Sequence, residues 1–161
     1  MFRKEEILNA LNEIPDPEIP VISIVELGVI REVKPDGKKI EVIITPTYSG
    51  CPAMKQMEAD VRKKLLEKGF EEVRITTVFN PAWTTDWMSE TARKKLQDYG
   101  IAPPEESTND KSFLTNKPKF ITCPRCKSKN TILISQFGST ACKALYKCNE
   151  CLEAFDYFKC I

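Results

Sequence analysis

The chain has 161 residues, a formal net charge of +1 and no histidine. Such a length can hold one domain of ordinary size together with a small module. The absence of histidine excludes Ser-His-Asp and Cys-His nucleophilic sites, so any metal must be held by thiolate, carboxylate, backbone or water ligands.

No apolar run approaches the ~18 residues that a membrane-spanning helix requires, and the first six residues lack the apolar segment of a secretion signal. We therefore expect a cytoplasmic protein with no membrane partner. In that reducing compartment, paired cysteines are expected to bind metal rather than to form disulfides.

Apolar spacing predicts a short amphipathic helix followed by strands. The helix covers residues 4–14, and Pro15-Asp16-Pro17 ends it. Asp36-Gly37 indicates a hairpin between two strands. β-Branched stretches predict three strands in this part of the chain, at residues 19–25, 28–33 and 39–45.

The next segments complete a small domain of the α/β (α+β) class. A long helix is expected from Pro52 to about Leu66, because apolar residues recur on one face and Gly69 follows. A strand over residues 72–79 and a helix over residues 89–99 come next. The expected order is α-β-β-β-α-β-α, in a domain of residues 1–100.

A second module is expected beyond a linker. Residues 101–119 are rich in proline and polar residues and show no periodicity, which indicates a linker. Residues 120–161 contain six of the seven cysteines and three predicted short strands, a pattern typical of a zinc-ribbon-like module. A module of ~40 residues rarely folds on a hydrophobic core alone, so we expect a metal to stabilise it.

Two Cys-x-x-Cys pairs in this module are separated by 21 residues. This spacing lets four thiolates surround one metal ion. We expect Zn(2+) in a role that holds the fold, with an iron-sulfur cluster as the alternative. The predicted ligands are Cys123, Cys126, Cys148 and Cys151.

Cys142 and Cys160 exceed the four ligands that a ribbon needs. They are either additional metal ligands that form a second thiolate site for transient iron or cluster binding, alone or together with Cys51, or packing or incidental thiols. The module is also basic: residues 117–161 carry 8 Lys/Arg and 3 Asp/Glu, whereas residues 1–116 carry 16 and 20. A ribbon module that recognises nucleic acid or an acidic protein is therefore an alternative function.

Cys51 stands apart from the other cysteines. We expect it at the start of the long helix, just before Pro52 at the first helical position. Unpaired N–H groups and the helix dipole favour an anion there, so the thiol pKa is expected to be lowered. Such a thiolate binds soft iron or copper or attacks an electrophile, whereas the alternative is a buried cysteine that serves only in packing.

Asp16 and Glu18 lie in a proline-rich loop that could approach the same region. They would supply hard oxygen ligands or hold backbone N–H groups of the loop. For Asp16 we favour the second, structural interpretation.

Three segments carry a resemblance to a known family: Asp16-Pro17-Glu18-Ile19-Pro20, Ile24–Ile30 and Thr45–Pro52. They resemble the signature of the metal-sulfur cluster assembly domain family. The resemblance implies a small α/β fold, a part in delivering iron-sulfur clusters, and Cys51 as the functional thiol. Asp16, Glu18 and Thr45 occupy matching motif positions.

The resemblance extends beyond that domain. Segments 79–89, 99–104, 139–146 and 155–160 resemble the D-type accessory subunits of phenylacetyl-CoA ring-epoxidase systems. This implies an accessory protein for maturation of the iron or iron-sulfur centres of a multicomponent monooxygenase, with transient Fe or Fe-S at Cys51. The implied partners are monooxygenase subunits or iron-sulfur assembly proteins, rather than nucleic acid.

A catalytic role for Cys51 as a nucleophile is a third hypothesis. Because the chain has no histidine, no obvious general base is present. We therefore expect a non-catalytic accessory or maturation subunit.

Overall fold

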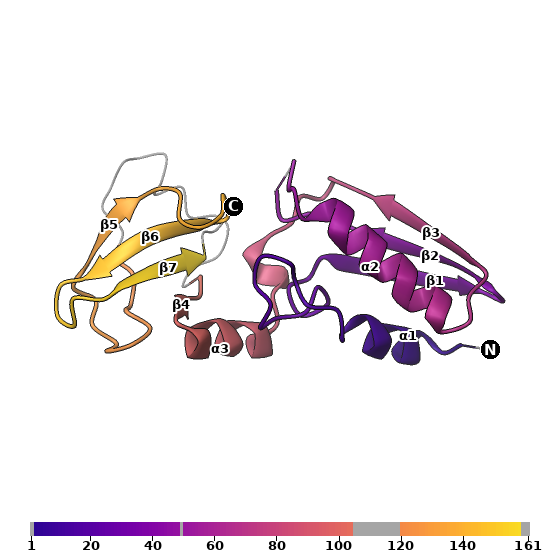
Figure 1. The fold of residues 1–161 in the computed structure, drawn as a ribbon, viewed down its shortest axis with the longest axis horizontal. Helices are drawn as coiled ribbons and strands as arrows, with labels where there is room; N and C mark the ends of the chain where they lie inside the picture. Colours follow the sequence, from indigo (N-terminus) through magenta and orange to yellow (C-terminus); the bar gives the residue numbers. More distant parts are fainter. Residues whose placement is uncertain (1, 49, 105–119, 159–161) are drawn as a thin grey trace. The chain divides into compact units, whose positions relative to one another are not determined.

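A computed structural model describes residues 2–48, 50–104 and 120–158 of the chain (Figure 1). The chain forms two compact units, Met1–Trp83 and Thr84–Ile161, and each is described separately below. Within the described ranges, no helix has both the length and the apolar character needed to cross a membrane.

The first unit contains a three-stranded sheet in the order β1-β2-β3. β1 and β2 form an antiparallel hairpin around Gly37, whose φ of +58° suits glycine. β2 and β3 are parallel, and a helix connects them. The elements are α1 (Lys4–Leu11), β1 (Ile30–Asp36), β2 (Lys39–Ile44), α2 (Met54–Glu67) and β3 (Glu72–Thr77).

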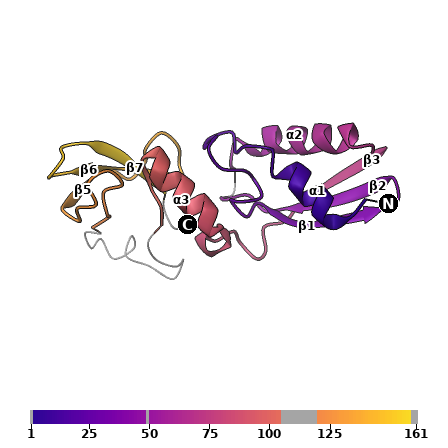
Figure 2. The same cartoon turned by 90° about the horizontal axis from the view of Figure 1, so that it is seen from below.

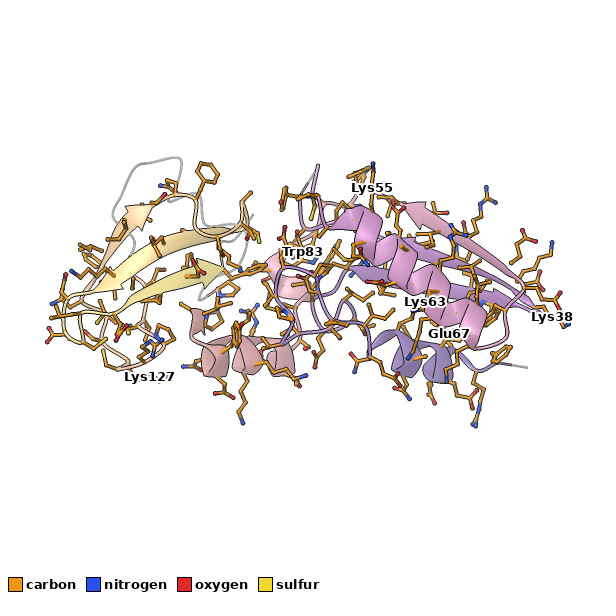
Figure 3. All side chains as sticks on the ribbon, in the orientation of Figure 1. Lys38, Lys55, Lys63, Glu67, Trp83 and Lys127 are labelled. Carbon is orange, nitrogen blue, oxygen red and sulfur yellow. The ribbon has the colours of Figure 1, made fainter. Side chains whose placement is uncertain are left out.

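The core of this unit lies between the sheet and the two helices. α2 contacts β3 and α1, and α1 contacts β1; Figure 2 shows α2 running alongside the strands. On β2 the alternate residues are buried, as expected for a strand with one covered face. The opposite side of α2 carries exposed polar residues, among them Lys55, Lys63 and Glu67 (Figure 3). The buried side chains include Ile40, Val42, Ile44, Met57, Val61 and Leu65.

The prediction of a strand over residues 19–25 is wrong, because this segment forms turns. The Ser23 N–H donates to Glu26 Oε2 and the Glu26 N–H donates to Ser23 Oγ, both at 3.0 Å. This reciprocal capping favours a tight turn over an extended strand. The isoleucines of the segment, Ile19, Ile22 and Ile24, are nevertheless buried, so their hydrophobicity indicated burial and not strand structure.

The second unit contains a short 3-10 helix, one α-helix and a four-stranded sheet. The sheet order is β4-β7-β6-β5. β5, β6 and β7 form an antiparallel meander, and β4 pairs in parallel with β7. The elements are η1 (Thr85–Trp87), α3 (Glu90–Tyr99), β4 (Ile101–Ala102), β5 (Thr131–Ser135), β6 (Lys143–Cys148) and β7 (Ala154–Phe158).

The division between the units differs from the boundary expected at residue 100. α3 belongs to the second unit, where Ser89 caps its start and Gly100, at φ +92°, ends it. Ile101 and Ala102, expected in the linker, pair with Asp156 and Tyr157 of β7. The rest of the expected linker, from residue 105 to 119, lies outside the described residues.

Candidate metal centre and functional thiol

The two Cys-x-x-Cys pairs occupy equivalent loops of the second unit. The Cys123 N–H donates to Ser128 O at 2.8 Å, and the Cys148 N–H donates to Glu153 O at 2.9 Å. Lys127 and Leu152, each directly after the second cysteine of its pair, have φ values of +65° and +63°. Because that backbone conformation costs a non-glycine residue about 1 kcal/mol, its occurrence at both positions indicates a shared loop geometry built around the sulfurs.

The four sulfur atoms of these loops lie within 4.8 Å of one another. Cys123 Sγ is 3.8 Å from Cys151 Sγ, and Cys126 Sγ is 3.5 Å from Cys148 Sγ. Four thiolates about 2.3 Å from a tetrahedral zinc ion are about 3.8 Å apart. The four cysteines, called the four-thiol site below, therefore fit one tetrahedral metal ion.

Electrostatics at the four-thiol site favour an anion at Cys148. The backbone N–H groups of Cys151 and Glu150 donate toward its sulfur and lower the pKa of the Cys148 thiol to about 7. At Cys151, the Glu153 N–H acts in the same direction, but burial and the neighbouring thiols outweigh it and raise the pKa to about 12. Cys148 thus ionises before Cys151, and a bound cation would favour the ionised form of both.

The ligand positions differ in exposure. Cys123 and Cys148 have no exposed surface and belong to the hydrophobic core of the second unit. Cys151 is half-buried and packs against that core, whereas Cys126 is exposed. The other core residues are Ala102, Ile121, Ala144, Tyr146, Phe155 and Tyr157.

Cys51 lies three residues before the first residue of α2. Ala53, not Cys51, is the N-cap, so the helix begins later than predicted and Pro52 is outside it. The Cys51 N–H donates to Tyr48 O, and the Met54 N–H donates to Cys51 O, both at 3.3 Å. These bonds hold the thiol in a tight turn, where it is 8% exposed.

The expected lowering of the Cys51 pKa is wrong. Burial raises the pKa of this thiol, and the charges of Glu18 and Asp16 raise it further. The Ala53 N–H and the Tyr48 side chain bond to the sulfur and act in the opposite direction, but they do not prevail. A backbone N–H near the helix start, that of Ala53, does lower the thiol pKa as the sequence suggested. The loss of solvent around the thiol raises the pKa by more.

The structure brings Asp16 and Glu18 close enough to Cys51 for their charges to act on it. Asp16 is buried, and its carboxylate accepts hydrogen bonds at 2.8 Å from the backbone N–H groups of Glu18 and Ile19. This confirms the structural role favoured for Asp16. The first of these bonds also fixes the backbone of Glu18, a half-buried residue.

Thr45, the remaining motif residue, directly follows β2. Its side chain is 1% exposed, and within the described parts of the chain its hydroxyl has no hydrogen-bond partner. Such a group costs free energy unless a partner is supplied. The side chain of Tyr48 bonds to the Cys51 sulfur, but Tyr48 was not identified as a site residue from the sequence. Its position three residues before the cysteine was the one indication that its hydroxyl could reach the thiol.

Cys142 lies apart from the four-thiol site. It directly precedes β6, whereas Cys148 ends that strand, and a strand of this length separates them by roughly 20 Å. Cys142 is buried, and its sulfur contacts Thr140 Oγ1 at 2.9 Å. Its use as an additional ligand of the four-thiol site is therefore excluded by distance, whereas Cys160 lies outside the described residues.

Comparison with protein families matches both parts of the chain. Residues 4–77 match the iron-sulfur cluster assembly protein family, and residues 107–159 match the PaaD zinc beta ribbon domain. A protein of Escherichia coli (strain K12), whose name describes it as the D-type subunit of a "Putative 1,2-phenylacetyl-CoA epoxidase", is 49% identical over 97% of this chain and 92% of its own length. The chain therefore belongs to the PaaD family, in which an iron-sulfur cluster assembly domain precedes a zinc ribbon.

Other relatives match the first part alone. An Fe-S protein maturation auxiliary factor of Porphyromonas gingivalis is 40% identical over 58% of this chain and 90% of its own length. A crystal structure of a domain of unknown function from Bacillus anthracis, 30% identical, covers 58% of this chain and 90% of its own, with a TM-score of 0.54. The assembly domain thus also occurs without a ribbon.

Proposed function

We propose that the protein is a cytoplasmic accessory factor that matures an iron or iron-sulfur centre of a phenylacetyl-CoA epoxidase-type monooxygenase. Cys51 would serve as the transient ligand of the iron or cluster, and the factor itself would not be a catalyst. Support comes from the names of the relatives: a D-type epoxidase subunit over nearly the whole chain, and Fe-S maturation auxiliary factors over the assembly domain.

The observation that carries this proposal is the charge around Cys51. Burial raises the pKa of the Cys51 thiol, and the negative charges of Glu18 and Asp16 add to this effect, so the free thiol is a poor nucleophile at neutral pH. The same negative charge attracts a cation, which displaces the thiol proton when it binds. A buried thiol beside carboxylates therefore suits a metal cargo better than it suits covalent catalysis.

We assign Zn(2+) to the four-thiol site, where it would hold the second unit together. The sulfur spacing fits a tetrahedral ion, and all four ligands are thiolates in closed loops, as in structural zinc sites. For Cys142 and Cys160 the two proposals remain a second thiolate site, separate from the four-thiol site, and a role in packing alone. Elemental analysis of the purified protein should give one zinc per chain, and iron in place of zinc would contradict the assignment.

The test of the maturation role uses Cys51→Ala. Anaerobic reconstitution with ferrous iron and sulfide should load the wild-type protein beyond its zinc content, and the variant should lose this extra iron. Epoxidase components matured in cells with the variant should show a loss of activity and of bound iron.

Glu13→Gln is the control, because Glu13 is an exposed residue of the same unit that pairs with Lys64 and has no proposed metal role. It should leave iron loading and epoxidase maturation unchanged. Full epoxidase activity with folded Cys51→Ala protein would overturn the proposal, and so would loss of activity in the control alone.

A further inference from the structure

The four cysteines of the four-thiol site are not equally exposed to solvent. Cys123 and Cys148 are 0% exposed, and Cys151 is half-buried. Cys126 is the exposed member of the group. Because thiolate reactivity requires access as well as charge, the exposed residue Cys126 is the ligand most open to a reagent from solvent.

Positively charged residues are close to Cys126 in the sequence. Arg125 and Lys127 flank Cys126, Lys129 follows two residues later, and all three are exposed. The Lys127 ammonium donates to Pro124 O at 3.1 Å, which keeps it beside the loop (Figure 3). On the facing loop, Glu150 is bound by the Asn130 side chain at 2.9 Å. These three cations, called the basic rim, attract anionic reagents to Cys126.

We propose that Cys126 is a covalent modification site through which the metal of the four-thiol site is released, and that its reagent is an anionic low-molecular-weight disulfide. This inference depends on a metal at that site but not on any role of Cys51. The Cys126 thiolate attacks one sulfur of the reagent, whose S–S bond breaks. One thiolate leaves with the electron pair, and Cys126 remains as an uncharged mixed disulfide that no longer binds the metal well.

The nearest sulfur then completes the oxidation. Cys148 Sγ lies 3.5 Å from Cys126 Sγ, and its attack on the Cys126 sulfur displaces the second small thiolate. In total, two cysteine thiolates lose two electrons and form a disulfide, and the reagent gains them as two thiolates. The metal has lost two of four ligands and leaves. Because Cys148 is also a core residue, the fold of the second unit loosens with it.

The order of reaction is the first test. Zinc-loaded full-length protein is treated with limiting oxidised glutathione, quenched with acid and mapped by peptide mass spectrometry, while a chromogenic chelator reports released zinc. Among the four ligands, glutathione should appear first on Cys126, and zinc release should follow at the same rate. First modification of Cys123, Cys148 or Cys151, or zinc release before Cys126 reacts, would overturn the proposal.

A ligand exchange provides the second test. Cys126→His retains a metal ligand but removes the exposed sulfur, and it should slow zinc release by oxidised glutathione at least about tenfold. Cys151→His, the same exchange at a half-buried ligand, should change the rate by less than about twofold. Equal slowing by both variants would contradict the assignment. If a variant holds no zinc, the mapping of the wild-type protein decides alone.

The charge of the reagent separates the basic rim from mere exposure. Anionic oxidised glutathione should modify Cys126 faster than cationic cystamine, and added salt should reduce the difference. Arg125→Gln should lower the rate with oxidised glutathione and raise it with cystamine. Rates independent of reagent charge would refute the choice of an anionic disulfide.

Discussion

Opposing effects act on the Cys51 thiol. Burial raises its pKa, and the charges of Glu18 and Asp16 raise it further, whereas hydrogen bonds from the Ala53 N–H and the Tyr48 side chain lower it. The sign of the net shift depends on how completely folding removes water from the thiol. The 8% exposure of Cys51 reverses the direction expected from the helix dipole.

This reversal gives a pH prediction. The pKa of the Cys51 thiol is raised above its ordinary value of 9.0, so its alkylation by iodoacetamide should become fast only above pH 9.0. Glu18→Gln removes one of the charges that raise the pKa and should move the rate profile to lower pH. Peptide mass spectrometry after timed alkylation follows Cys51 separately from the other thiols.

Glu13→Gln is the control for this experiment, because Glu13 is exposed and pairs with Lys64 on the same unit. It should leave the Cys51 profile in place. The same shift bears on stability: the contribution of this thiol is complete below pH 9.0 and is lost as pH rises through the folded-state pKa. An alkylation profile with its midpoint below pH 9.0 would contradict the burial argument.

At the scale of elements, periodicity and glycine signals were reliable wherever local rules decide. The β1–β2 hairpin at Gly37 and the three helices appear in the predicted places. The exception is the segment after Asp16, where side-chain bonds from Asp16 and Ser23 to the backbone replace strand pairing. The short polar residues carried that information, but the apolar run between them dominated the prediction.

The loop between β5 and β6 fits closely against β7. A Cβ atom on Gly138 would lie 2.6 Å from Asp156 Oδ1, well inside van der Waals contact. The Gly138 N–H also donates to Lys143 O at 2.7 Å, which fixes the loop in place. Gly138→Ala should therefore lower the free energy of unfolding of the second unit by about 1 kcal/mol, the low end for overpacked sites, because the Asp156 carboxylate can turn away at the expense of its bond to Ser139. Chemical denaturation followed by circular dichroism measures the change.

A double-mutant cycle identifies the clash as the cause. Asp156→Ala removes the opposing carboxylate, so adding Gly138→Ala in that background should cost much less than in the wild-type protein. An equal cost in both backgrounds would mean that backbone flexibility, and not the contact with Asp156, requires glycine.

At the scale of the whole molecule, the sequence revealed two modules, but not where they divide. Composition separated the cysteine-rich end from the rest of the chain, and a proline-rich segment indicated the junction. The structure assigns α3 to the second unit, because β4 follows it directly and pairs with β7. A strand of two residues leaves no periodic signal, so this pairing could not be read from the sequence.

Removal of the metal should distinguish the two units. Two of the eight buried residues in the core cluster around the four-thiol site are themselves metal ligands, and structural zinc contributes roughly 10–16 kcal/mol in small modules. A strong chelator should therefore collapse the amide NMR signals of residues 84–104 and 120–158 to unfolded positions. The signals of residues 2–83 should remain dispersed, since that unit has its own core. Retained dispersion in both units would contradict a structural metal.

The parallel pairing of β4 with β7 has a consequence for protein engineering. The family boundary of the ribbon, at residue 107, excludes both α3 and β4. A fragment that starts there would leave β7 with an unpaired apolar edge and would lack Ala102, which is 1% exposed in the intact unit. Exposed edges of this kind promote self-association. An autonomous ribbon should therefore begin before residue 84, and shorter fragments would report on aggregation rather than on metal binding.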